Sequence, residues 1–306
     1  MMTFTTQSMQ TILPTLENIL LTQNSLSFHV LNPDTSDAYA GTHIEVASKA
    51  YIYRSYKAWS DLAELLHCKM LTPEKIETHL VKLTFTKLKT DSFHADSKDS
   101  EKYGTDSHFA QIHKMEEPAF FYYYQQALKN VKIEKRMDIL NLGVNRADEF
   151  EVIKNSLDTE TYKRLNLIGI DHSKTAIAYA EHLFQEENVT FHTVDINDID
   201  SLKLGQFDLL ISIGTLQSPS INFKPFFMKL VQEYLKKDSA IILGFPNSRW
   251  VGGEMVYGAK APNYAMSEMS LVLNDIIFCK KYLQQKKYRV TITGKHYLFL
   301  TATKIG

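Results

Sequence analysis

The chain has 306 residues, of which 44% are hydrophobic and 23% charged, and 34 Lys and Arg residues nearly balance 35 Asp and Glu residues. This is an ordinary globular composition, and a formal net charge of −1 argues against broad, non-specific capture of nucleic acid or anionic membranes. The only two cysteines, Cys68 and Cys279, lie far apart, so no disulfide framework or tetrathiolate zinc site is expected. Because residues 1–10 lack the features of a secretory signal and no apolar stretch reaches the roughly 18 residues of a membrane span, we expect a cytoplasmic protein.

Residues 1–108 are expected to form an N-terminal helical cap that takes part in substrate recognition. Apolar residues recur at helical spacing over residues 44–65, and again over residues 76–83 after a Thr-Pro start. Residues 90–107 are rich in Asp, Ser and Lys, and this composition indicates a loop.

Residues 109–306 alternate short apolar runs with amphipathic segments after an initial helix over residues 109–129. This alternation predicts βαβ units and a parallel sheet, whereas the last two strands are separated by too few residues for a crossover and must form an antiparallel hairpin. The fold class expected is therefore α/β, a doubly wound, mostly parallel sheet with a C-terminal antiparallel hairpin and the N-terminal helical cap. The expected strands are residues 137–142, 165–170, 189–194, 207–214, 239–245, 289–294 and 296–304.

A ligand of such a sheet binds beyond the carboxyl ends of its strands. The first strand leads into Gly143, which allows a sharp turn, and Asn145 tolerates a left-handed conformation better than most residues. The motif is not G-x-G-x-x-G. Asp148 and Glu149 stand where a dinucleotide would place its pyrophosphate, so phosphate-bearing cofactors are disfavoured.

Acidic residues follow the next two strands. Asp171 is placed to accept hydrogen bonds from ribose hydroxyls, and Asp195 could accept from an exocyclic amine while Ile196 packs on a purine ring. The fourth strand ends in the small residues Ser212 and Gly214, close to the expected site.

These motifs together resemble the class I (Rossmann-like) S-adenosylmethionine-dependent methyltransferases over about residues 103–304. The resemblance rests on ILNLGVNRA, GIDHS, VDIND and FDLLISIGTLQS, in chain order, with the closing helix and hairpin. It implies a seven-stranded sheet with the last strand antiparallel, S-adenosylmethionine as cofactor and S-adenosylhomocysteine as product. The family usually has an acidic residue where Asn141 stands, a partner for the cofactor's amino group, and more glycines where Asn145 and Ala147 stand.

The resemblance also implies roles for single residues. Gly143 would lie against the methionine part of the cofactor, Asp171 would hold the ribose, Asp195 and Ile196 would frame the adenine, and Ser212 with Gly214 would line the methyl-transfer face. The cofactor contacts expected are Gly143, Asn145, Asp171, His172, Asp195, Ile196, Ser212, Gly214 and Tyr103.

The long connection over residues 244–264 is the expected substrate-binding segment. It is dense in glycine, aromatic and hydrogen-bonding residues, and such loops are usually functional or disordered. A surface loop packed on its own aromatic residues is the alternative. The substrate contacts expected are Arg249, Glu254, Tyr257, Asn263, Tyr264 and, from the cap, Arg54, and the weaker candidates for catalysis are Gln217, Tyr257 and Tyr53.

The function expected is methylation of a small or medium-sized metabolite, because the near-neutral charge disfavours a nucleic-acid substrate. One alternative is an RNA- or protein-modifying methyltransferase, with Arg54, Lys57, Arg249 and Lys260 in a local groove. Another is a catalytically silent binding protein of the same fold, prompted by the altered glycine motif. Neither a metal site nor a membrane partner is expected, since the histidines lack standard ligand spacing.

Overall fold

The chain forms two compact units, each described by itself: residues 1–92 with 250–255, and residues 93–249 with 256–306. The first division between them falls within residues 89–103. Both that stretch and the predicted boundary at residue 108 lie outside the described residues. Across the described ranges, no helix combines the length and apolar character that a membrane crossing requires. A computed structural model describes residues 1–88, 104–105, 113–218, 220–246, 248–251, 254–257, 269–295 and 297–305.

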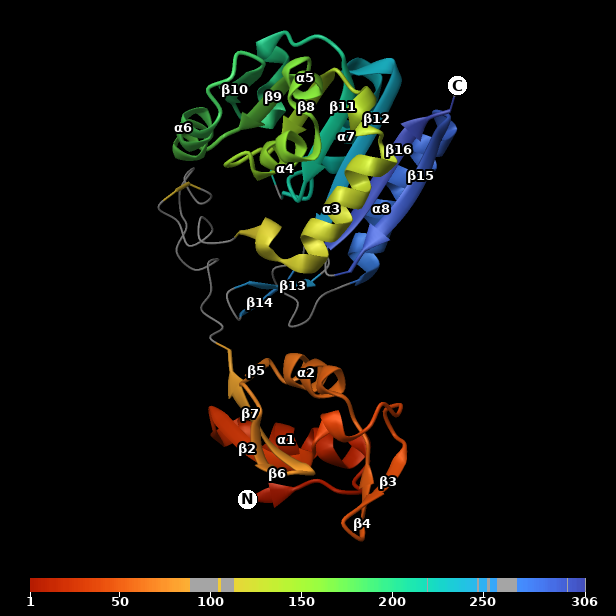
Figure 1. Ribbon diagram of the computed structural model, residues 1–306. Helices are drawn as coiled ribbons and strands as arrows, with labels where there is room; N and C mark the ends of the chain where they lie inside the picture. Colours follow the sequence, from red (N-terminus) through yellow and green to blue (C-terminus); the bar gives the residue numbers. More distant parts are fainter. Residues whose placement is uncertain are drawn as a thin grey trace. The chain divides into compact units, whose positions relative to one another are not determined.

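The N-terminal unit is built on a sheet of order β1-β2-β7-β5, with β6 also paired to β7 (Figure 1). Two helices pack on this sheet, and their apolar faces bury Leu16, Phe28 and Trp59 in one cluster. A two-stranded hairpin completes the unit. Its elements are β1 (Met2–Thr3), α1 (Met9–Thr22), β2 (Ser25–Leu31), the 3₁₀ turn η1 (Pro33–Thr35), β3 (His43–Val46), β4 (Lys49–Ile52), α2 (Tyr56–Leu65), β5 (Cys68–Met70), β6 (Glu74–Glu77) and β7 (Leu80–Lys87).

The predicted helical cap is wrong over much of its length: residues 56–65 form a helix as expected, but residues 43–46, 49–52, 74–77 and 80–87 are strands. Ala47 and Ser48 adopt left-handed backbone conformations, with φ of 52° and 58°, and these close a tight β3–β4 turn without the Asn-Gly signal that usually announces one. In β7 the buried side chains are Val81, Leu83 and Phe85, which is the two-residue period of a strand.

The C-terminal unit contains the predicted seven-stranded sheet, in the order β10-β9-β8-β11-β12-β16-β15. The first five strands of this order run parallel, and β16 pairs antiparallel with both β12 and β15. The structure confirms the predicted hairpin and strand order along the chain. Its strands are β8 (Asp138–Leu142), β9 (Asn166–Asp171), β10 (Val189–Thr193), β11 (Phe207–Ile213), β12 (Leu235–Pro246), β15 (Tyr288–Gly294) and β16 (Tyr297–Lys304).

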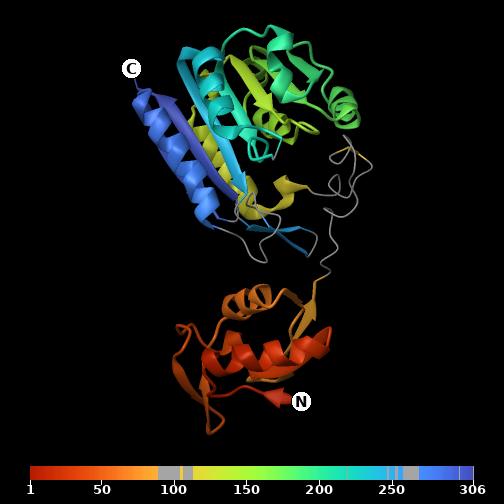
Figure 2. The same ribbon diagram turned by 180° about the vertical axis from the view of Figure 1, so that it is seen from behind.

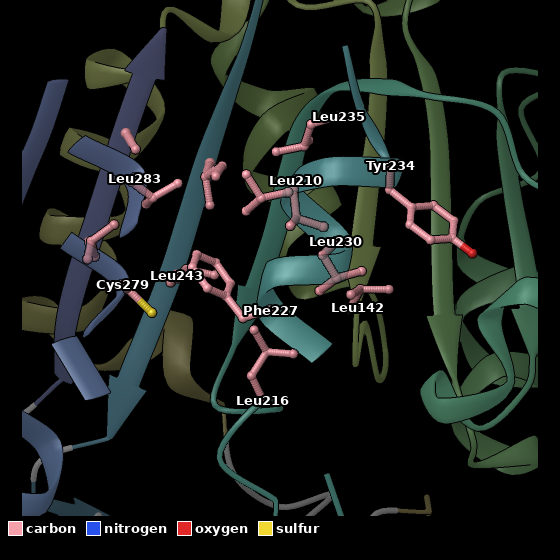
Figure 3. Close-up of a cluster of buried hydrophobic side chains, with 14 of the residues drawn as sticks. Leu142, Leu210, Leu216, Phe227, Leu230, Tyr234, Leu235, Leu243, Cys279 and Leu283 are labelled. Atoms are coloured by element: carbon pink, nitrogen blue, oxygen red, sulfur yellow. The ribbon is translucent and has the colours of Figure 1, made fainter. Parts of the chain in front are cut away.

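Helices cover both faces of this sheet, so its strands are apolar on both sides (Figures 1 and 2). Helices α3, α4 and α6 lie on one face, and α7 and α8 on the other. In Figure 3, Phe227 of α7 and Cys279 of α8 pack toward Leu210 and Leu243 of the central strands. The helices and 3₁₀ turns are η3 (Lys114–Glu116), α3 (Pro118–Asn130), η4 (Ile133–Lys135), α4 (Asp148–Ser156), α5 (Thr159–Lys163), α6 (Lys174–Leu183), η5 (Ile196–Leu202), α7 (Phe223–Glu233) and α8 (Met269–Gln285).

Two residues that the sequence suggested for the active site pack inside the N-terminal unit: Tyr53 as a candidate for catalysis and Arg54 as a substrate contact. Tyr53 is 5% exposed, and its hydroxyl donates to the carbonyl oxygen of Pro33. Arg54 is 7% exposed, donates to the carbonyl oxygen of Gln7 at 2.7 Å and lies 5.5 Å from the ring centroid of Trp59. These contacts favour a structural role for both residues.

Arg54→Ala should destabilise the N-terminal unit by about 1–3 kcal/mol, because it leaves a carbonyl oxygen without its donor and removes packing over Trp59. Thermal unfolding measures the loss. Lys57→Ala is the control: Lys57 is 76% exposed and pairs with Asp61 on the surface, so its removal should change stability by about 0.5 kcal/mol or less. Equal stability of the two variants would contradict the structural role.

Candidate functional site

The turn after β8 is unusually tight. Three of its residues have left-handed backbones: Gly143 (φ 73°), Asn145 (φ 46°) and Ala147 (φ 66°). A Cβ atom on Gly143 would lie 1.9 Å from the side-chain oxygen of Thr215, which follows β11, so both conformation and space require glycine there. The backbone N–H of Gly143 donates to the carbonyl oxygen of Ile170 at 2.8 Å and holds the turn against β9.

The Asp171 carboxylate at the end of β9 joins this turn to the next helix. One of its oxygens accepts from the backbone N–H of Asn145 at 2.9 Å, and the other from the backbone N–H of Ser173 at 3.0 Å. Asp171 is 4% exposed, and His172 Nδ1 lies 3.4 Å from it. Because each carboxylate oxygen has two lone pairs, the fixed carboxylate retains acceptor capacity for a ligand hydroxyl.

The predicted adenine contacts have different environments. Asp195 is exposed, and it accepts hydrogen bonds from the backbone and side chain of Asn197, both at 2.9 Å. Ile196 is 6% exposed and belongs to the core cluster beneath α7 and α8. Asp195 therefore offers a carboxylate to solvent at this edge, whereas Ile196 is mainly a core residue.

The end of β11 meets the start of β16 at the predicted methyl-transfer face. Ser212 is buried and its hydroxyl donates to the carbonyl oxygen of Leu142. A Cβ atom on Gly214 would lie 2.1 Å from the hydroxyl oxygen of Tyr297, and one on Gly244 would lie 2.9 Å from the same ring. Tyr297 thus covers the carboxyl ends of two strands.

The buried side-chain oxygen of Gln217 accepts no hydrogen bond within the described structure.

A partly buried carboxylate, that of Glu149, lies where β8 meets α4. The buried Asn141 amide donates to the Glu149 carboxylate at 3.5 Å. Burial, and next the charge of Asp148, raises the pKa of Glu149 to about 7, against the opposing effects of Lys114 and Asn141. The Lys114 ammonium lies 5.2 Å from the ring centroid of Tyr297, the first residue of β16.

The acceptors along this edge suit a ligand with hydroxyl, amine and cationic groups. Asp171, Asp195 and Glu149 present carboxylate oxygens, and the negative charges that open α4 disfavour a phosphate at the first turn. These residues fit S-adenosylmethionine, which carries a ribose, an adenine amine, a sulfonium and an amino group. Asp171 would hold the ribose, and the positive φ of Gly143 brings bare backbone to the site.

Half of the six remaining predicted residues fall outside the described part of the chain. Tyr103, Asn263 and Tyr264 lie there. Arg249 belongs to β13 (Ser248–Val251), and Glu254 and Tyr257 to β14 (Glu254–Tyr257), a two-stranded sheet that begins two residues after β12 ends.

From the sequence, Glu149 served only as an argument against a phosphate at the first turn. Thr215, Tyr297 and Lys114 were assigned no role at this edge. Glu149 carried a usable signal, an acid in the first turn after an altered glycine motif. Tyr297 carried none, because its position depends on the register of β16 against β12.

Glu149→Gln should make the protein more stable at high pH. The raised pKa means that the folded chain retains a proton between pH 4.5 and about 7 that the unfolded chain releases, so rising pH weakens the wild type over this window. The free energy of unfolding of the variant should equal that of wild type near pH 4.5 and exceed it by up to about 3 kcal/mol above pH 8. Because the side chain is partly exposed, contact with water reduces this difference.

Thermal unfolding between pH 4.5 and pH 8.5, roughly the window set by that pKa, measures this difference. Glu151→Gln is the control, because Glu151 is exposed in the same helical turn. A difference between Glu149→Gln and wild type that does not grow with pH would contradict the interpretation.

Comparison of the chain with protein-family models gives a match. The chain matches a family model described as a methyltransferase domain over residues 133–292, more than half of its length. A search of curated protein sequences gives no significant match.

Solved structures that resemble the chain include methyltransferases. One is the CurJ carbon methyltransferase, with 14% identity and a TM-score of 0.43 over 68% of this chain and 57% of the CurJ chain. Another is an S-adenosylmethionine-dependent methyltransferase from Aquifex aeolicus, with 14% identity and a TM-score of 0.46 over 68% of this chain and 100% of that chain. A third is precorrin-6y C5,15-methyltransferase from Geobacter metallireducens GS-15, with 9% identity and a TM-score of 0.42 over 60% of this chain and 88% of that chain.

The family match confirms the predicted class of enzyme, with S-adenosylmethionine as cofactor and S-adenosylhomocysteine as product. It spans the strands from β8 to β12, the turn at Gly143 and the Asp171 carboxylate. The chain therefore belongs to this methyltransferase domain family and is an S-adenosylmethionine-dependent methyltransferase.

Proposed function

We propose that this chain methylates a small or medium-sized metabolite. The observation that carries the cofactor part is the buried Asp171 carboxylate, which two backbone N–H groups hold at the end of β9. The observation behind the acceptor is electrostatic: 34 basic against 35 acidic residues give no general attraction for a polyanion.

S-adenosylmethionine supplies the methyl group, bound to a positively charged sulfur. The residues of this chain bind the cofactor, orient it toward the acceptor and exclude water from the site. Asp171 accepts from the ribose, Asp195 accepts from the adenine amine, and Ser212 with Gly214 keeps the end of β11 small. Methyl transfer requires an in-line approach of the acceptor, so positioning and exclusion of water account for most of the rate enhancement.

The acceptor is expected to contact the segment after β12. Chain connectivity supports this, because β13 starts two residues beyond the carboxyl end of β12. Arg249, Glu254 and Tyr257 belong to this segment and supply the charged and aromatic groups that a polar metabolite needs. An RNA or protein acceptor is the alternative, and a steep dependence of RNA binding on salt would favour it.

Asp171→Ala should strongly weaken cofactor binding. Removing the carboxylate takes away the ribose acceptor and frees the N–H groups of Asn145 and Ser173, so the affinity for S-adenosylhomocysteine should fall by at least about 100-fold. Calorimetric titration with S-adenosylmethionine and S-adenosylhomocysteine measures this, with the exposed Asp198→Ala as control. Failure of the folded wild type to bind either compound would contradict the proposed function.

Tyr257→Ala and Arg249→Ala should slow methyl transfer without weakening S-adenosylhomocysteine binding, since the proposal assigns these residues to the acceptor. Radiolabelled methyl transfer to fractionated metabolite extract, RNA and protein identifies the acceptor class first, and steady-state kinetics of the variants follow on the fraction that is labelled. Unchanged turnover and acceptor affinity in both variants would remove this segment from the substrate site.

A further inference from the structure

The Glu149 carboxylate lies at the cofactor edge in a position that disfavours its ionised form. It lies partly buried in the first turn of α4, next to Asp148 in the chain and 3.5 Å from the amide nitrogen of Asn141. Desolvation and the neighbouring negative charge both disfavour its ionised form. A glutamine would keep the size and the helix without this cost, so the position is not optimised for stability.

A cation at this place would offset the cost. Lys114 already attracts Glu149 from the turn before α3, and its ammonium lies against the rings of Phe120 and Tyr297, at 5.9 and 5.2 Å. The edge therefore combines a carboxylate with a nearby ammonium. Such a pair is complementary to an α-amino acid group, whose ammonium and carboxylate carry the opposite charges.

The residue beside this carboxylate, Asn141, carries a neutral amide. Asn141 is 1% exposed at the end of the central strand β8, one residue before the strand ends. Its amide donates toward Glu149, so it orients the carboxylate but supplies no negative charge itself. In the connection from β8 to α4, the negative charges are those of the first turn of α4, which include Asp148 and Glu149.

We propose that Glu149 binds the α-ammonium group of the cofactor's methionine part and supplies, from α4, the negative charge that Asn141 lacks. This rests on the proposed function, because it needs the cofactor at this edge. Asp171 and Glu149 then divide the recognition of the cofactor: Asp171 holds the ribose, and Glu149 holds the amino acid end.

Two ligands separate these roles. S-adenosylhomocysteine carries both the nucleoside and the amino acid group, whereas 5′-methylthioadenosine lacks the amino acid group. Calorimetry at pH 8, on the full chain, compares wild type, Glu149→Gln, the exposed control Glu151→Gln and the double variant Asn141→Asp with Glu149→Gln.

Glu149→Gln should lower the affinity for S-adenosylhomocysteine by at least about tenfold and the affinity for 5′-methylthioadenosine by about twofold or less. The reason is that only the first ligand loses a charge-assisted hydrogen bond. Glu151→Gln should bind both ligands like wild type. Restoring a carboxylate beside the lost one, in the double variant, should recover part of the affinity for S-adenosylhomocysteine alone. A structural role for Glu149 would not produce this selectivity.

Four results would overturn the assignment. Equal binding of S-adenosylhomocysteine by wild type and Glu149→Gln would remove Glu149 from the site and leave the proposed function standing. An equal loss of affinity for both ligands in Glu149→Gln would make Glu149 a structural residue. If the double variant recovers no affinity for S-adenosylhomocysteine, a carboxylate at position 141 cannot replace that of Glu149. A wild type that binds neither ligand would overturn the proposed function and this inference together.

Discussion

The Asp171 carboxylate is the interaction on which the cofactor edge depends. Its two oxygens bind backbone N–H groups on both sides, in the turn after β8 and at the start of α6. The turn cannot relax easily, because Gly143, Asn145 and Ala147 all hold left-handed conformations. One side chain therefore sets the shape of two successive connections, and a ligand that hydrogen-bonds to it meets a surface arranged before binding.

Charge at this edge is arranged at the expense of stability. Negative side chains open α4, and the Glu149 carboxylate is partly removed from water beside another acid. The helix dipole offsets part of the cost but not the desolvation. Sites that bind charged ligands commonly retain such unfavourable groups, and stability is then recovered elsewhere, here in the two apolar clusters on either face of the sheet.

The C-terminal unit could be predicted closely because its strands are buried on both faces and separated by amphipathic helices, two signals that periodicity detects directly. The N-terminal unit could not. Its β3–β4 turn uses Ala47 and Ser48 in conformations that these residues rarely adopt, and the alternation in β7 overlaps with a helical spacing. At the site, the acids at strand ends were visible in the sequence. Tyr297 was not, because only the pairing of β16 with β12 brings it to the edge.

The ring of Tyr297 fills space at the ends of two neighbouring strands. It rests on Gly214 and Gly244, so the space beyond the ends of β11 and β12 is filled from a third strand rather than by their own side chains. The volume at this edge therefore depends on a residue far along the chain from the cofactor motifs. A smaller residue at position 297 would leave this space unfilled and would also remove ring contacts with Phe120 and Phe299 in the core.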